Sequence, residues 1–99
     1  MKLQIQSIHF TADVKLTDFI QKKLDKLETF YDKIIGAEVF LKVENDDQKE
    51  NKIVQIKLQI KGYDLIVKEQ FSTFEEGVDA AYENLKRQLL KTKEKLQAH

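Results

Sequence analysis

The stretch that decides the fold is 13-DVKLTDFIQKKLDKLETFYDKIIGAEVFLKVE-44, in which a helical pattern gives way to a strand pattern. Over residues 16–34 apolar side chains recur at steps of three and four, which predicts one amphipathic helix. Asp13 stands where an N-cap is needed, and Gly36 stands where a left-handed residue would end the helix. From residue 37 to residue 44 apolar and polar side chains alternate, which predicts a strand.

Three further segments show the alternation of a strand. They are residues 2–7 before the helix, and residues 52–61 and 65–71 after it. The sequence Gly62-Tyr63-Asp64 separates the last two and predicts a tight turn. The polar stretch 45–51 has no period, which predicts a loop.

A second amphipathic helix ends the chain. A capping box predicts its start, formed by Thr73 with Glu76 or by Ser72 with Glu75. Its predicted core stripe consists of Phe74, Val78, Ala81, Tyr82, Leu85, Leu89 and Leu96.

The resulting order, β-α-β-β-β-α, restricts the topology. A right-handed crossover should make the first two strands parallel, and the short later connections should form an antiparallel meander. Each strand has one apolar face, so both helices should cover the same side of the sheet. We therefore expect an α+β fold, a two-layer sandwich of a four-stranded sheet with both helices on one face, as a single domain over residues 1–99.

The composition argues against several classes of protein. The chain has 99 residues, 41% hydrophobic and 34% charged, which is typical of a soluble globular domain. No apolar run is long enough for a membrane span and no secretory signal is evident, so we expect a cytoplasmic protein. Cysteine is absent, and His9 and His99 are the only histidines. Motifs for nucleophilic catalysis or phosphate loops are also absent, so we expect no enzyme activity, metal or cofactor.

The net charge is zero, but the charges of the first helix are segregated. At 100° per residue, four lysines lie within about 40° along one edge of the apolar stripe, and Lys23 can reach the same edge. Those four are Lys15, Lys22, Lys26 and Lys33. The acids of the opposite flank are Asp18, Asp25, Glu28 and Asp32. Ion pairs four residues apart, such as Asp18–Lys22, are one explanation, and a binding surface is the other.

The last helix separates its charges along its length. The charged residues of 73–85 are all acids. Residues 86–99 carry one acid, Glu94, and the basic residues Lys86, Arg87, Lys91, Lys93 and Lys95. The helix dipole accounts for basic residues in the last turn but not for those two to three turns earlier. If the two helices lie side by side, their basic rows can form one patch suited to a phosphate backbone, without specifying a base sequence.

Three segments carry a resemblance to a known family. Together, 22-KKLDKLETFYDKI-34, 39-VFLKVE-44 and 78-VDAAYENLKRQLLKTKEKL-96 resemble the ribosome hibernation-promoting factor family, also called ribosome-associated inhibitor, protein Y or sigma-54 modulation protein. The resemblance covers essentially the whole chain. Two positions depart from the family pattern: Thr92 stands where an aromatic residue or histidine is common, and Glu69 stands where a small residue is usual, which leaves the register of the fourth strand open.

The resemblance implies a partner and a mode of action. The partner would be the small ribosomal subunit, both its rRNA and its proteins, bound in the mRNA and tRNA channel so that translation is inhibited in stationary phase or stress. The length matches the short form, so we expect a monomer that promotes ribosome dimerisation with a partner factor. The RNA-binding residues that it implies are Lys22, Lys23, Lys26, Lys86, Arg87, Lys91, Lys93 and Lys95.

Two other functions are compatible with the same pattern. A sheet with two helices on one face also describes double-stranded-RNA-binding modules. A protein-interaction domain could instead use the open sheet face, toward which alternation turns Phe40, Ile53 and Ile66. Leu90 lies off the core stripe of the last helix, so we expect it to be exposed inside the basic patch.

Overall fold

The computed structural model describes residues 1–44 and 49–97, the last two by their backbone alone. Its elements are β1 (Lys2–Ile8), α1 (Val14–Asp25), the short 3₁₀ helix η1 (Lys26–Thr29), β2 (Ile34–Val43), β3 (Lys52–Ile60), β4 (Tyr63–Phe71) and α2 (Phe74–Gln97). The predicted β-α-β-β-β-α order is confirmed. The predicted core residue Leu96 and the residue His99 lie outside the side chains that the structure describes.

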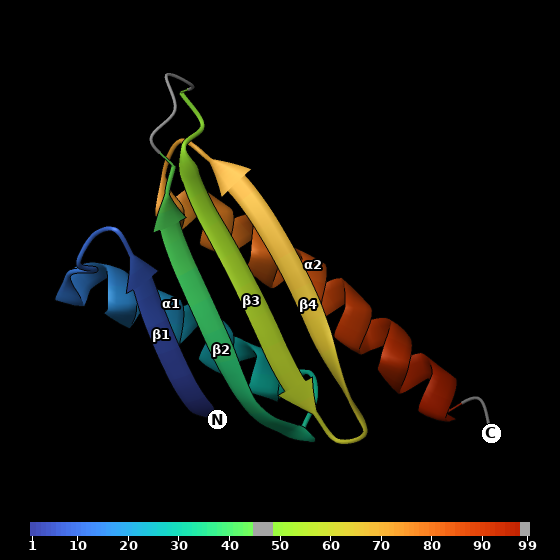
Figure 1. Ribbon diagram of the computed structural model, residues 1–99. Coiled ribbons are helices and arrows are strands. Elements are labelled where there is room, and N and C mark those ends of the chain that lie inside the picture. The colour runs from blue at the N-terminus through green and yellow to red at the C-terminus, as the bar shows by residue number, and fades with distance from the viewer. Residues whose placement is uncertain (45–48, 98–99) are drawn as a thin grey trace.

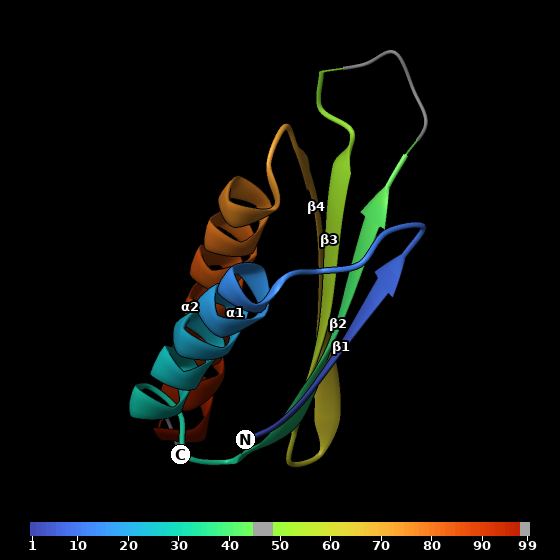
Figure 2. The same ribbon diagram turned by 90° about the vertical axis from the view of Figure 1, so that its left-hand side faces the viewer.

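The four strands form one sheet in the order β1-β2-β3-β4, and the helices lie side by side against it (Figure 1). β1 runs parallel to β2, whereas β2–β3 and β3–β4 are antiparallel, as the crossover and the meander predict. Both helices cover the same face, and the described helices leave the other face of the sheet open (Figure 2). The predicted two-layer α+β sandwich is therefore confirmed.

The core fills the space between the sheet and the two helices. On β3, Ile56 and Leu58 are fully buried while the alternating Gln55 and Lys57 are only half-buried, as the period of two predicts. Fully buried leucines and isoleucines also line the helices, among them Ile20, Leu24, Leu85 and Leu89. Burial of each such side chain stabilises the fold by roughly 2 kcal/mol, so the helices are fixed over the sheet.

The first helix begins as predicted but ends earlier. Asp13 Oδ1 accepts a hydrogen bond from the backbone N–H of Leu16 at 2.8 Å and caps its start. After Asp25 the chain tightens into η1, where the Thr29 hydroxyl donates to the carbonyl of Lys26 at 2.7 Å. Apolar side chains still recur at steps of three and four after Asp25, because the chain there continues to turn side chains toward the core. The helix itself has already ended.

Gly36 is not the left-handed stop that the sequence predicts. It lies inside β2, opposite Lys2 of β1. A Cβ at Gly36 would stand 2.8 Å from the carbonyl oxygen of Lys2, so glycine permits the close approach of the two parallel strands. The glycine that adopts a positive φ, +103°, is Gly62 in the predicted turn between β3 and β4.

The start of α2 and the register of β4 are both settled by the structure. Thr73 Oγ1 accepts from the backbone N–H of Glu76 at 3.2 Å, so Thr73 is the cap, not Ser72. On β4, Glu69 pairs with Val54 of β3 and therefore faces the helices at the edge of the sheet, where it is half-buried.

Candidate nucleic-acid interface

The basic edge of α1 is turned toward α2. Lys23 Nζ lies 2.9 Å from Asp79 Oδ1 and 5.1 Å from the centre of the Tyr82 ring, both on α2. The hydrogen bond to Asp79 raises the pKa of Lys23 above its ordinary value. This lysine is one of the predicted RNA-binding residues, and within the free protein its charge is already paired.

A second lysine crosses between the helices in the opposite direction. Lys86 of α2 places its ammonium 4.7 Å from the centre of the Phe30 ring, directly after η1. Such a cation–π contact contributes about 0.5–1 kcal/mol when exposed and more when desolvated. Lys23 and Lys86 therefore join the two helices, in addition to the cations that they bring to the surface.

The acidic flank of α1 lies on the side away from α2. Glu28 accepts a hydrogen bond from the Met1 amine at 2.8 Å, which raises the pKa of that amine. Asp25 accepts from Gln21 at 2.8 Å. Asp18–Lys22, the example of ion pairing four residues apart, is not among the ion pairs of the described residues. Segregation of charge across α1 is therefore real, and pairing between neighbouring turns does not explain it.

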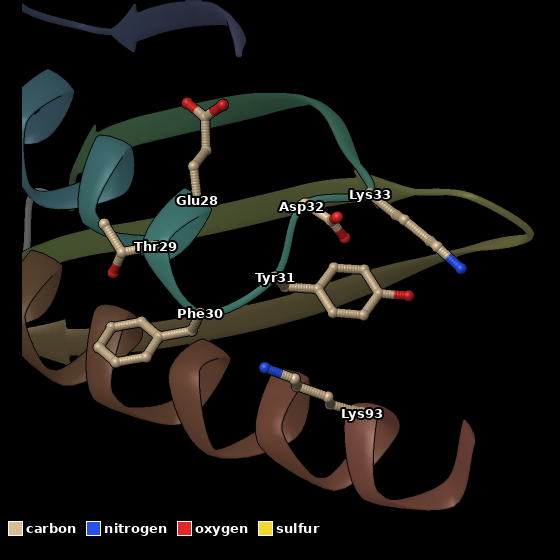
Figure 3. Close-up of a pocket in the computed structure, with 7 residues that line it drawn as sticks. All are labelled: Glu28, Thr29, Phe30, Tyr31, Asp32, Lys33 and Lys93. Carbon is tan, nitrogen blue, oxygen red and sulfur yellow. The ribbon is translucent and has the colours of Figure 1, made fainter. Parts of the chain in front are cut away.

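A pocket of about 410 Å³ lies between the chain after η1 and the C-terminal half of α2. Lys93 reaches from α2 toward Phe30 and Tyr31, whose rings line the pocket, while Glu28 points away to the far side (Figure 3). Lys33 lines the same pocket. The sequence places Lys33 on the helical row, but α1 ends before it. The turn into β2 instead brings Lys33 to the pocket that Lys93 also lines.

The remaining basic residues of α2 lie around its outer surface. At 100° per residue, Lys91 stands about 140° from Lys86, so the two face opposite sides of the helix. Lys91 and Lys95 line a groove of about 390 Å³ against Tyr63 of β4, whereas Lys86 and Arg87 line a shallow pocket with Leu90. The sequence-predicted set is therefore not one flat patch.

We call the surface formed by the predicted cations the basic band. Six of its members are exposed: Lys22, Lys26, Arg87, Lys91, Lys93 and Lys95. Lys23 and Lys86 are half-buried between the helices. The band begins on the α2-facing edge of α1, crosses between the helices and wraps the C-terminal half of α2. The predicted RNA-binding set omitted Lys33, although the charge pattern placed it on the basic row of the first helix. It also omitted Tyr63, which the turn before β4 carries to the band.

The open face of the sheet is only partly apolar. Ile66 is 60% exposed, but Phe40 is half-buried and Ile53 is 6% exposed. Leu90 is 39% exposed on α2, as the sequence predicts. Because two of its three predicted apolar members are partly or fully covered, this face offers less apolar contact area than the alternation predicts.

Other kinds of site are not supported by the described residues. Across residues 1–44 and 49–97, no three histidine or acidic side chains are grouped to hold a metal ion. His9 is exposed with a φ of 71°, which makes it the turn residue expected of a lone histidine. Neither α1 nor α2 has the length and apolarity needed to cross a membrane.

The sequence and fold of this chain match those of known proteins. The family model described as "Sigma 54 modulation protein / S30EA ribosomal protein" matches residues 3–97. A ribosome hibernation promoting factor of Pseudomonas putida is 34% identical over 98 residues, which are 99% of this chain and 92% of the relative. One from Klebsiella oxytoca is 30% identical over 99 residues, which are 100% of both chains. The chain belongs to the Sigma 54 modulation protein / S30EA ribosomal protein family.

Two solved structures share the fold. The N-terminal domain of Thermus thermophilus Protein Y superposes with a TM-score of 0.81 at 19% identity, over 93% of this chain and 99% of that domain. A ribosomal subunit interface protein from Coxiella burnetii superposes with a TM-score of 0.82 at 22% identity, over 94% of this chain and 98% of that chain. The family resemblance seen in the sequence is confirmed. This family consists of binding proteins, so the chain is not an enzyme.

Proposed function

We propose that this chain is a ribosome hibernation factor that binds the small ribosomal subunit in the channel for mRNA and tRNA. The names of its relatives support association with the ribosome in a hibernating state. Bound there, the chain inhibits translation by steric occlusion, without catalysis. The proposal includes a cytoplasmic location, action in stationary phase or stress, and a monomer that favours ribosome dimers together with a partner factor.

The observation that carries this proposal is the basic band. Net charge is zero, yet the acids of α1 lie on its far flank, and four of the five acids of α2 lie in its first half, the exception being Glu94. The cations are thereby concentrated over the helix layer and the C-terminal half of α2. Six exposed basic side chains in one band suit the closely spaced phosphates of folded rRNA, since each neutralised phosphate releases counterions and adds to affinity.

Co-sedimentation with purified small subunits tests the proposal. The test variant carries Lys26→Glu, Arg87→Glu and Lys91→Glu, which reverses the charge at three exposed positions of the band. If each charge-assisted phosphate contact contributes roughly 1.5 kcal/mol, the loss of affinity is about 1,000-fold. If this variant binds small subunits as tightly as the native chain does, the assignment of the basic band as the binding surface is wrong.

A matched control changes the same amount of charge elsewhere. The control variant carries Lys2→Glu, Lys49→Glu and Lys68→Glu, all at exposed positions outside the band. It should retain most of its affinity, losing only the long-range attraction that salt screens. Equal losses in both variants would indicate nonspecific attraction instead of a defined interface. Equal affinity of the native chain for arbitrary duplex RNA would favour a general double-stranded-RNA-binding module.

A further inference from the structure

Tyr63 presents a fixed aromatic ring at the surface beside the basic band. It is the first residue of β4, directly after the turn at Gly62, and it is 48% exposed. Its hydroxyl oxygen lies 2.7 Å from Thr92 Oγ1. Because the Thr92 hydroxyl donates to the carbonyl of Gln88 at 3.0 Å, Tyr63 is the donor in the first bond. These two bonds tether the ring to α2 and limit its rotation.

The groove next to this ring has the chemistry of a nucleotide site. Its volume is about 390 Å³, and its lining includes Lys91 and Lys95 from one face of α2 together with the apolar side chain of Leu65. No carboxylate is among the described residues that line it. The neighbouring Asp64 instead pairs with Lys57 at 3.6 Å, on the open face of the sheet. An exposed ring in the same groove as two lysines, with no acid among the described residues that line it, offers a stacking surface and two phosphate contacts at once.

We propose that this groove binds one nucleotide of single-stranded RNA, with its base stacked on Tyr63 and the flanking phosphates held by Lys91 and Lys95. The inference rests on the proposed function, since it takes RNA as the ligand, and it adds an unpaired segment to the backbone contacts of the basic band. Stacking on one aromatic ring tolerates any base, so the site selects unpaired RNA over duplex and not one sequence over another. Charge complementarity favours RNA over an apolar peptide in this groove.

Tyrosine fluorescence reports directly on this site. The chain has no tryptophan, and two of its three tyrosines, Tyr31 and Tyr82, are only 7% and 6% exposed. A short single-stranded oligoadenylate should therefore quench the emission of Tyr63 on stacking. Tyr63→Phe keeps the ring, so it should bind the oligonucleotide within a fewfold of the native chain, yet its remaining emission should not respond. Quenching that persists in Tyr63→Phe would overturn the site.

Polyphosphate, a polyanion without bases, distinguishes the contribution of base stacking to affinity from the contribution of charge. Tyr63→Ala should weaken oligoadenylate binding by about 5- to 150-fold, the range measured for one stacked base, and leave polyphosphate binding unchanged. Ile66→Ala, 60% exposed on the open face of the same strand, is the matched control and should change neither. Equal loss for both ligands, or no loss for either, contradicts the proposal. Binding of a free adenine mononucleotide as tightly as the oligonucleotide also contradicts it.

Failure of this inference is distinguishable from failure of the proposed function. If Tyr63→Ala binds oligoadenylate as well as the native chain does, but the charge-reversed band variant no longer sediments with small subunits, the stacking site is wrong and the ribosomal function stands. If the native chain does not sediment with small subunits but still shows quenching that depends on Tyr63, the ribosomal function is wrong and the stacking site stands.

Discussion

The pair between Lys23 and Asp79 makes a prediction in which stability and RNA affinity move in opposite directions. Asp79→Asn removes the carboxylate charge while keeping the size of the side chain. The contact between α1 and α2 loses the Lys23–Asp79 ion pair, so the fold is destabilised. The Lys23 ammonium, no longer neutralised, becomes available to a phosphate, so affinity for small subunits or RNA rises.

The magnitude follows from the distance and the exposure. At 2.9 Å the Coulomb energy is about 1.4 kcal/mol at a dielectric constant of 80 and about 6 kcal/mol at 20. Lys23 is 26% exposed and Asp79 is 53% exposed, so solvent screening and side-chain ordering reduce the net value to roughly 0.5–1 kcal/mol. Because the pKa of Lys23 is raised above 10.5, this contribution is present below pH 10.5 and is lost as the pH rises through the raised value.

Two measurements test the prediction. Chemical denaturation at neutral pH should show a loss of about 0.5–1 kcal/mol in the free energy of unfolding. The slope of log affinity against log salt should steepen by about 0.7–0.9, the value of one added phosphate contact. Asp64→Asn, which frees Lys57 on the open sheet face, is the matched control and should leave the slope unchanged. A variant Asp79→Asn that binds no better than the native chain would refute the reasoning.

Two further predictions concern how α2 is held. Gly77→Ala should destabilise the fold by about 1–2 kcal/mol despite its better helix propensity, because the new Cβ would stand 2.8 Å from Val54 Cγ2 in the core. In a double-mutant cycle with Val54→Ala the two losses should be less than additive; strict additivity contradicts the contact. Thr73→Ala should cost about 1 kcal/mol of stability in thermal unfolding through loss of the cap, whereas Ser72→Ala should cost little. Equal effects would show that the cap is not specific to Thr73.

The sequence predicts most of the architecture because two periodicities determine it. Alternation in the strands and three- to four-residue steps in the helices fix which faces are apolar, and burial of those faces leaves few topologies. The end of α1 was predicted wrongly because Tyr31 and Ile34 keep the helical spacing while the chain has already turned toward β2. Gly36 resembles a helix stop in the sequence, yet it is required by the neighbouring strand β1, which lies far away along the chain.

The sequence names a set of cations for the candidate site but does not give their arrangement. The segregation of charge on α1 follows from 100° per residue, and the structure bears it out by turning that edge toward α2. Which cations are free is a tertiary property, because the partners of Lys23 and Lys86 come from the other side of the helix pair. Whether those free cations contact rRNA stays a prediction.

The sequence by itself therefore determined the fold class and the presence of a cationic surface, since periodicity and charge spacing are local properties of a chain, and the resemblance of three segments indicated the family. Only the tertiary structure decided how that surface is built. Packing of both helices on one face pairs Lys23 with Asp79 and wraps the remaining cations around α2. The β3–β4 turn then places Tyr63 beside Lys91, although the two are far apart in the chain. That juxtaposition depends on which elements pack together, and no local pattern encodes it.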